Sequence, residues 1–425
     1  MRSFTSVALM ACGLNTALAG VLDFSLSRRA VSPDNTCGTQ GTGGTPNAYT
    51  CPTELPCCSS NGFCGSTDDY CLVGGGCQSP FGTCKTPEAE SPPPESPPSE
   101  SPPPESPPPE SPPPESPPPT TTPSGGLCGP GIGSCGPTEC CSGAGFCGTG
   151  IDYCQAPDCQ FKFGPACDAH ALPTGTNTSS IPRPKAGNVL YGSAGIYDCT
   201  ETGTMALTFD DGPYIYTEHV LDLLKQYNAK ATFFVTGNNI GKGAIDDPST
   251  PWPGLLRRMF AEGHQIASHS WSHADLCDIT SAERKNEMYK LEMAVRNVLG
   301  VIPTYMRPPY SSCNAECGCE ADMEELGYHI TYFDLDTSDY LNNTPELIQN
   351  SKNLFDQPLE GKSPATDDFL LIAHDIHNTT SEVLTEYMLQ GIAARGYRPV
   401  TVGTCLGDDQ ANWYRADASA PAPAK

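Results

Sequence analysis

The sequence predicts an α/β protein whose main domain is a (β/α) barrel, preceded by two small disulfide-rich modules. From residue 188 to residue 408, apolar β-prone runs alternate with helical patterns, which favours a parallel sheet covered by helices. Cysteines cluster in two short blocks, 37–84 and 128–167, and a Pro-rich repeat lies between them. A chain of 425 residues is long enough for this number of folded parts.

Residues 1–19 are typical of a secretory signal peptide. Arg2 precedes an apolar stretch that is too short to cross a membrane, and a small-residue cleavage site follows. The 23 cysteines are ordinary only for a secreted protein. The net charge of −26 argues against nucleic acid or an anionic membrane as partner. We therefore expect a secreted monomer without a membrane span, extracellular or associated with the cell wall.

The two cysteine blocks share one internal pattern. In each, Cys-Cys-Ser is followed by Gly-Phe-Cys-Gly and then by Asp-Tyr-Cys, beginning at Cys57 in the first block and at Cys140 in the second. Blocks of this size cannot hold a hydrophobic core, so disulfides must constrain them. A metal-binding knuckle is the alternative, which secretion and the even number of cysteines disfavour.

On this pattern, both blocks resemble hevein-type chitin-binding modules, at 37–84 and 127–167. The resemblance implies that aromatic rings stack on N-acetylglucosamine units while hydroxyl groups bind the acetamido group. The implied residues are Ser59, Phe63 and Tyr70 in the first module and Ser142, Phe146 and Tyr153 in the second. A further aromatic residue of the family is replaced by Asn61 and Ala144, so each module should bind weakly and the two together more firmly.

Three segments are expected to lie outside the folded parts. A linker is expected at 85–126, and the Ser-Pro-Pro-Pro-Glu repeat that runs from Ser91 through Thr120 should make it an extended polyproline II segment. A shorter linker is expected at 168–187 and a flexible tail at 409–425. The long first linker should let the outer module hold the polymer surface while the inner module stays near the enzyme, and neither module is expected to contribute groups to the catalytic site.

Within the main domain, the elements are expected in alternating order. The expected strands are 204–209, 231–235, 265–268, 304–307, 329–335, 369–373 and 397–402. The expected helices are 217–227, 254–262, 281–299, 320–326, 345–355 and 382–395. In such barrels the chemistry lies on loops after the C-terminal ends of the strands.

The first expected strand ends in two adjacent carboxylates, Asp210 and Asp211, followed by Gly-Pro. Neighbouring strand residues point to opposite sides, but at a strand end both carboxylates can turn toward one site. One can then bind a metal ion while the other moves a proton. Taken alone, the motif is more often a solvated turn.

Two imidazoles follow the third expected strand. His269 and His273 have the i, i+4 spacing that allows two side chains to hold one ion. Together with Asp211 they form a set with open positions for water and substrate, which is the catalytic kind of metal site. The alternative for the isolated pair is two unrelated surface histidines.

Polar groups also follow three later strands. Arg307 begins an Arg-Pro-Pro-Tyr segment, where it can keep a carboxylate ionised, and the prolines leave the N–H of Tyr310 free to point inward. A carboxylate cluster occupies 334–340, and His374 ends an apolar run. A surface arginine in a turn and a satisfied core histidine are the alternatives.

Together these five segments resemble the polysaccharide deacetylases with a NodB-like domain, the family 4 carbohydrate esterases, over 188–408. The resemblance implies a distorted (β/α) barrel and one divalent metal ion on Asp211, His269 and His273, usually zinc and sometimes cobalt. It also implies that Asp210 is the general base and that Arg307 is its partner. His374 is the implied general acid, and Asp339 is the carboxylate that orients it. The backbone N–H of Tyr310 is the implied donor to the oxyanion. Tyr340 and Ile372 stand where the family usually has a Trp of the groove wall and a Leu of the acetyl-methyl pocket.

The two resemblances together imply metal-dependent removal of N-acetyl groups from chitin and chito-oligosaccharides, which gives chitosan and acetate. Deacetylation of peptidoglycan or acetylxylan is one alternative, which the modules and the many cysteines disfavour. A chitin-binding, lectin-like protein with little catalysis is another. The complete set of ligands and acid–base residues disfavours it.

The six cysteines of the main domain are expected to form three disulfides. We expect Cys199–Cys405 and, on family resemblance, Cys313–Cys317, which leaves Cys277 with Cys319; an exchange of Cys317 and Cys319 stays open. Glycosylation sequons occur at Asn177, Asn342 and Asn378. The last two follow catalytic segments so closely that we do not expect both to be occupied.

Overall fold

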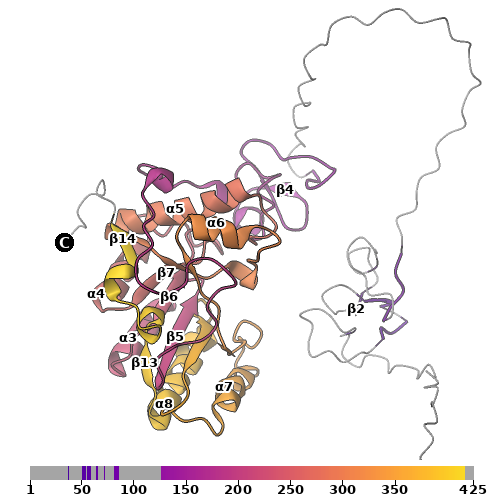
Figure 1. Cartoon of the computed structure of the whole chain (residues 1–425). Helices are drawn as coiled ribbons and strands as arrows, with labels where there is room; N and C mark the ends of the chain where they lie inside the picture. Colours follow the sequence, from indigo (N-terminus) through magenta and orange to yellow (C-terminus); the bar gives the residue numbers. More distant parts are fainter. Residues whose placement is uncertain are drawn as a thin grey trace, which may run out of the picture. The chain divides into compact units, whose positions relative to one another are not determined.

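The structure is a computed structural model that describes residues 37, 50–53, 55–58, 64–65, 71, 81–85 and 126–416. The predicted signal peptide, nearly all of the linker 85–126, and Ser59, Phe63 and Tyr70 lie outside these residues. The chain divides into two compact units, 1–112 and 113–425 (Figure 1). In the part that is described, no helix combines the length and the apolar character needed to cross a membrane.

The two modules have the same disulfide pattern where both are described. The first contains strands β1 (Cys57–Cys58) and β2 (Cys64–Gly65), with disulfides Cys37–Cys58, Cys51–Cys64 and Cys57–Cys71. The second contains β3 (Cys140–Cys141), β4 (Cys147–Gly148) and α2 (Ile151–Cys154), with disulfides Cys128–Cys141, Cys135–Cys147, Cys140–Cys154 and Cys159–Cys167. The internal repeat of the sequence is therefore a repeat in structure.

A parallel sheet of eight strands forms the distorted (β/α) barrel. Its order is β10-β9-β7-β6-β5-β12-β11, and β13 also pairs with β5. The strands are β5 (Thr204–Asp210), β6 (Thr232–Val235), β7 (Gln265–Ser268), β9 (Tyr305–Met306), β10 (His329–Ile330), β11 (Leu335–Asp336), β12 (Phe369–His374) and β13 (Arg398–Val400). The single strand expected at 329–335 is wrong, because β10 and β11 are separate and lie at opposite ends of this order.

Helices surround this sheet (Figure 1). They are α3 (Thr217–Gln226), α4 (Trp252–Ala261), α5 (Ser281–Leu299), α6 (Cys319–Glu325), α7 (Ile348–Asp356), α8 (Thr385–Arg395) and the short α9 (Val402–Cys405). The longest, α5, has the bounds expected from the sequence. Thr280 and Glu283 form a capping box at its start, and Gly300 ends it in the left-handed conformation.

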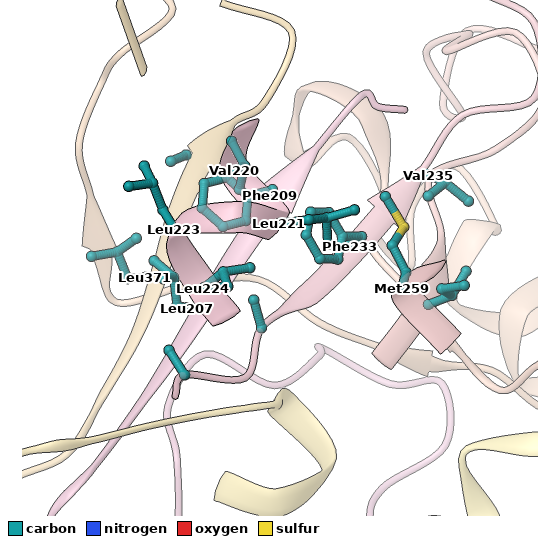
Figure 2. Close-up of a cluster of buried hydrophobic side chains, with 14 of the residues drawn as sticks. Leu207, Phe209, Val220, Leu221, Leu223, Leu224, Phe233, Val235, Met259 and Leu371 are labelled. Carbon is teal, nitrogen blue, oxygen red and sulfur yellow. The ribbon is translucent and has the colours of Figure 1, made fainter. Parts of the chain in front are cut away.

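Alternate residues of each strand pack into different cores. On β5, Leu207 and Phe209 pack with Leu221 of α3 in the larger core, between sheet and helices (Figure 2). Ala206 belongs to a second core on the other face of the strand. Because side chains alternate, Asp210 continues the row of Ala206 at the C-terminal end of β5. The alternation therefore delivers one carboxylate into the mouth of the barrel.

The segment 168–187, expected to be a linker, is instead packed on the main domain. It contains two 3-10 turns, η2 (Asp168–His170) and η3 (Thr178–Ser180). Thr178 is fully buried, and the guanidinium of Arg183 donates to the Glu292 carboxylate of α5 at 2.8 Å. The expectation of a free linker is therefore wrong, because polar and buried contacts fix this segment along α5.

Part of the expected flexible tail also belongs to the fold. Strand β14 (Tyr414–Ala416) pairs antiparallel with β8 (Val301–Pro303), after the short η7 (Gln410–Asn412). Trp413 is buried, and its indole lies so close to Gly403 that a Cβ there would come within 2.1 Å of it. The boundary expected at residue 408 is wrong, since burial of this indole holds the chain to residue 416.

The second module is docked on the barrel and is not a tethered body. The Ile240 N–H donates to the Ala156 carbonyl of the module at 2.7 Å, and Lys290 donates at 2.6 Å to the carbonyl of Ala169, in the segment that directly follows the module. Module residues line a pocket together with Tyr310 of the barrel. The second module thus lies near the enzyme, as expected for the inner module, but direct contacts hold it there, because the packed residues 168–187 leave it no free linker.

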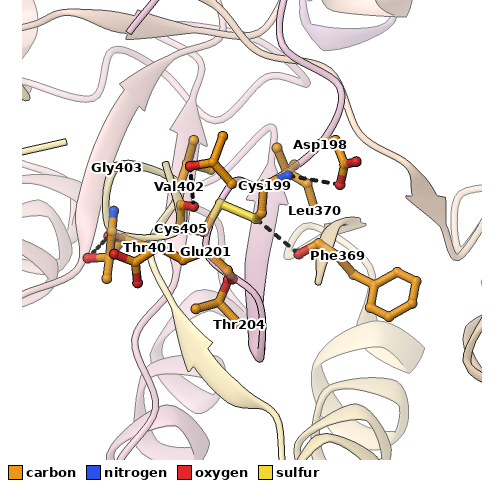
Figure 3. The surroundings of a disulfide bond; sticks show 12 residues. Asp198, Cys199, Glu201, Thr204, Phe369, Leu370, Thr401, Val402, Gly403 and Cys405 are labelled. Carbon is orange, nitrogen blue, oxygen red and sulfur yellow. Dashed lines mark hydrogen bonds between the residues drawn. A yellow bond between two sulfur atoms is a disulfide. The ribbon is translucent and has the colours of Figure 1, made fainter. Parts of the chain in front are cut away.

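The disulfide Cys199–Cys405 is present, as expected from the sequence (Figure 3). It ties the segment before β5 to the end of α9. The N–H groups of Thr200 and Glu201 both donate to the Cys405 carbonyl at 3.0 Å. The bridge and these hydrogen bonds close the domain at the N-terminal end of β5.

The two local disulfides differ from the expected pairs. Cys313–Cys317 and Cys277–Cys319 were expected, whereas the bridges are Cys313–Cys319 and Cys277–Cys317. Cys319 begins α6 and is buried in the same core as Cys313. Cys317 stays half-buried in the preceding loop, beside the half-buried Cys277. Because Cys319 lies in the first turn of α6, it is held beside Cys313, and Cys317 is left to pair with Cys277.

Replacing Cys199 and Cys405 by alanine should lower the free energy of unfolding by about 3–5 kcal/mol, because the bridge closes a long loop in the unfolded chain. The sequence separation is 206 residues, against 40 for Cys277–Cys317. Loop-closure entropy makes the long bridge the stronger by about 1.5 kcal/mol. Urea unfolding of both double variants would measure this, and an equal loss in the two would contradict it.

Candidate active site

The two carboxylates after β5 enter the same site by different means. Asp210 faces the barrel interior through strand alternation. Asp211 follows with a φ of 75°, a left-handed conformation that is uncommon outside glycine. Its N–H donates to the Phe234 carbonyl of β6 at 3.1 Å. This reversal brings the second carboxylate into the barrel mouth beside the first.

Arg307 holds Asp210 in place from the end of β9. Its Nη1 donates to Oδ1 of Asp210 and to Oγ1 of Thr208, both at 2.7 Å. Its other nitrogens donate to the carbonyls of Thr331 and Tyr332. Burial raises the pKa of Asp210, and the Arg307 guanidinium opposes that change. The second oxygen, Oδ2, is buried without a hydrogen-bond partner among the described residues.

Asp211, His269 and His273 bring three potential ligand atoms together, all within 4.8 Å of one another. Nε2 of His273 lies 3.2 Å from Oδ1 of Asp211, and Nε2 of His269 lies 3.6 Å from it. Nδ1 of His269 is 2.7 Å from the Arg307 carbonyl, which can only accept, so Nδ1 carries the proton and Nε2 is free. Burial lowers the pKa of both imidazoles to about 4, which keeps them neutral. An unpartnered carboxylate oxygen beside two neutral imidazoles fits a divalent metal ion.

Two contacts with neighbouring elements hold the loop between His269 and His273 in place. The Glu287 carboxylate of α5 accepts from the Ser272 N–H at 2.7 Å and from its hydroxyl at 3.0 Å. Trp271 is fully buried and packs on Gly237, where a Cβ would come within 2.0 Å of the indole. Both contacts position His273 indirectly, and no local sequence pattern indicates them.

Two further buried groups support the turn after β5. Lys242 donates to the carbonyls of Asp211 and Gly212, at 2.7 and 3.0 Å, and to the Thr236 hydroxyl at 2.8 Å. Burial lowers the pKa of Lys242 to about 7. Asp375 lies against Gly212, and burial raises its pKa to about 7. Sequence reasoning missed both, although Lys242 stands between two glycines and Asp375 directly follows His374.

His374 faces the same site from β12. It pairs with Asp210 in the register of β12 and β5. Its Nδ1 lies 2.7 Å from Oδ1 of Asp339, whose other oxygen accepts from the His374 N–H and the Thr380 hydroxyl. Burial alone would lower the pKa of His374, but the Asp339 carboxylate raises it to about 10. The raised pKa favours the protonated form of the imidazole opposite Asp210 at neutral pH.

The remaining predicted barrel residues line the surroundings of this centre. The ring of Tyr310 lies edge-on to His273, at 4.6 Å between centroids, and that of Tyr340 lies edge-on to His374, at 5.3 Å. Both tyrosines are exposed, whereas Ile372 is buried on β12. Tyr310 has a φ of 57°, so the loop after β9 also has left-handed backbone.

The described module and sequon residues differ in their exposure. In the second module, Phe146 is exposed, Tyr153 half-buried and Ser142 buried, and the Ser142 hydroxyl accepts from the Phe146 N–H. Asn177 and Asn378 are exposed. Asn342 is buried, donates to the Ser338 carbonyl and accepts from Asn350, a position that disfavours glycan attachment.

Residues 197–331 match the family described as Polysaccharide deacetylase. A chitin deacetylase of Colletotrichum lindemuthianum is 43% identical over 254 residues, which cover 60% of this chain and 98% of that protein. The chain belongs to the polysaccharide deacetylase family. The solved structure of the chitin deacetylase from Colletotrichum lindemuthianum has a TM-score of 0.51 to this polysaccharide deacetylase. The two sequences are 42% identical, and the match covers 54% of this chain and 98% of that chain. A probable peptidoglycan-N-acetylglucosamine deacetylase of Arthroderma benhamiae is 41% identical over 221 residues, 52% of this chain and 48% of that protein.

Glu287→Ala should loosen the metal-binding trio, our name for the candidate ligands Asp211, His269 and His273, without touching it, because the buried donors of Ser272 lose their acceptor. We expect metal affinity to fall about 10–100-fold, as for other residues that orient ligands, and the free energy of unfolding to fall by about 1–3 kcal/mol. Competition with a chromophoric chelator and urea unfolding would measure both. Glu325→Ala, at an exposed carboxylate of α6, is the control. Unchanged metal affinity in Glu287→Ala would contradict the role.

Proposed function

We propose that this polysaccharide deacetylase hydrolyses the N-acetyl groups of N-acetylglucosamine units in chitin and chito-oligosaccharides. The observation that carries the proposal is one barrel mouth with three adjoining parts. They are a carboxylate held by a buried arginine, a trio suited to a metal ion, and an imidazole whose pKa is raised by a buried carboxylate. Two modules with the hevein-type cysteine pattern favour chitin as the polymer, as does the name of the similar Colletotrichum lindemuthianum protein.

We propose one divalent metal ion on Asp211, His269 and His273, zinc first and cobalt as the alternative. When bound, such an ion supplies Lewis-acid chemistry, which polarises the acetamide carbonyl and makes a water molecule more acidic. The neutral state of both imidazoles and the unpartnered oxygen of Asp211 support this assignment.

The chain's own residues then carry the proton transfers. Asp210 takes a proton from the attacking water, and Oδ2 is the oxygen that is free to do so, because Oδ1 accepts from Arg307. The N–H of Tyr310 donates to the oxyanion of the tetrahedral intermediate. His374, held by Asp339, protonates the leaving amine, which departs poorly without that proton. Acetate and a glucosamine unit are the products.

The surroundings of the site suggest how the sugar is accepted. Ile372 would line the space for the acetyl methyl group, and the exposed ring of Tyr340 would form a wall of the groove. In the modules, Ser59, Phe63 and Tyr70 and their counterparts Ser142, Phe146 and Tyr153 would bind further units of the polymer. We also propose secretion after removal of residues 1–19, action outside the cell or at the cell wall, and glycan attachment at Asn177 and Asn378.

Peptidoglycan is the second candidate substrate, because the similar Arthroderma benhamiae protein is named a probable peptidoglycan-N-acetylglucosamine deacetylase. Acetate release from a chitin oligomer and from peptidoglycan, each with and without chelator, would separate the two. Release from peptidoglycan alone would overturn the choice of chitin.

His273→Ala, Asp210→Asn and His374→Ala should each lower deacetylation of a chitin oligomer by a factor of about 10³ or more. Only His273→Ala should also lose the metal ion, because Asp210 and His374 move protons and are not ligands. Elemental analysis and acetate release measure the two effects. His219→Ala, at an exposed histidine of α3, is the matched control. Full metal occupancy in His273→Ala would refute the assignment of ligands.

Asp339→Asn should move the alkaline limb of the pH–rate profile to lower pH by about 1–3 units, because it removes a charge that stabilises protonated His374. A general acid must be protonated, so a lower pKa means that the active form is lost at a lower pH. The control is Asp222→Asn, on the outer helix α3. An unmoved alkaline limb in Asp339→Asn would contradict His374 as the acid.

A further inference from the structure

A pocket of about 440 Å³ lies between the second module and the barrel. Residues 156–163 form its module wall, and the barrel wall includes Asp275, Asp278 and Tyr310. The volume falls within the roughly 300–1,000 Å³ that is common for small-molecule sites. The pocket therefore has room for a ligand that neither the module nor the barrel would enclose alone.

Tyr310 connects this pocket with the metal-binding trio. Its side chain lines the pocket, is 60% exposed, and meets the ring of His273 edge-on. A molecule that occupies the pocket would therefore lie one side chain away from a predicted metal ligand. The same polymer chain can then reach both places.

The module wall also adjoins the sugar-binding face predicted for the module. Gln160 lines the pocket, and its Nε2 donates to the Ser142 carbonyl at 2.9 Å. Asp158 lines the pocket as well, and its carbonyl would lie 3.1 Å from a Cβ placed on Gly143. Two residues of the pocket wall are thus in direct contact with Ser142 and the neighbouring Gly143.

The walls combine the two kinds of group that a sugar ring requires. Pro157, Phe161 and Phe163 supply apolar surface for the C–H faces, and Asp158, Asp275 and Asp278 supply acceptors for hydroxyl groups. Lys162, the cation of this wall, lies 3.7 Å from Glu283 of α5. The acceptors that remain suit a neutral, hydroxyl-rich ligand better than an anionic one.

We propose that this pocket is a subsite for a further N-acetylglucosamine unit of the substrate chain, built jointly by the second module and the barrel. The proposal rests on the proposed function and adds to it a place where the polymer binds. The chain runs from the face of the module, through the pocket and past Tyr310, to the metal-binding trio. The second module is then a wall of the substrate groove.

Variants on the two walls test the subsite in the full-length, metal-loaded protein. Asp158→Arg fills the pocket from the module side and Asp278→Arg from the barrel side, and both residues are exposed. Asp152→Arg is the matched control, because Asp152 is exposed on the same module outside the lining. Acetate release is measured with the N-acetylglucosamine trimer and hexamer, since the longer chain has more units that can occupy the pocket while another unit lies at the trio.

In each pocket variant, the ratio of kcat/KM for the hexamer to kcat/KM for the trimer should fall about tenfold, which corresponds to the loss of one good contact. The control should keep the wild-type ratio. Ratios within about twofold of wild type in both pocket variants, or a fall in only one of them, would overturn the joint subsite. Acetate release by the wild type from either oligomer tests the proposed function separately, because it does not depend on the ratio.

Discussion

The buried guanidinium of Arg307 is the interaction on which the rest of the site depends. Its side chain binds Asp210, while its carbonyl accepts from His269, so one residue positions both a carboxylate and an imidazole. Its guanidinium carbon lies 4.2 Å from the ring centroid of Phe234 in the barrel interior. Neither partner of the Arg307–Asp210 ion pair is exposed by more than 1%. Loss of one would leave a buried charge without compensation, which is among the most destabilising changes that a core can suffer.

Strained backbone is concentrated around the same centre. Asp211, Ser270, His273 and Tyr310 all have left-handed φ angles between 57° and 75°. Each such residue costs on the order of 1 kcal/mol or more and persists only where its surroundings enforce it. Here Lys242 supplies that constraint for the turn after β5, and Glu287 supplies it for the histidine loop. The rigid core of the barrel thus holds a conformation that the loops would not adopt alone.

Sequence patterns were sufficient for the elements with a clear period. The bounds of α5 followed from its helical pattern, and β5 and β7 followed from short apolar runs. The run 329–335 could not reveal its division into β10 and β11, because apolar continuity does not report which strand each half joins. The carboxylates and histidines were found by type and spacing. The side to which Asp211 turns depends on one φ angle, and Lys242 and Glu287 act through tertiary contacts that no local pattern encodes.

The boundaries of the folded parts were the least predictable feature. Residues 168–187 have the composition of a spacer, and only the partner of Arg183 on α5 shows that they are packed. Trp413 and Tyr414 were the overlooked sign that the domain extends beyond residue 408, because aromatic side chains are seldom left in a solvated tail.

The docking of the second module has a consequence for the direction in which a sugar polymer can bind. The two ends of a sugar polymer are chemically different, and a module that could turn freely would present the chain to the barrel either way round. A module fixed by Ala156, Ala169 and the packed segment that follows cannot turn. A chain bound to both surfaces would therefore enter in one polarity. The unit that loses its acetyl group would then be set by its distance from one particular end of the polymer.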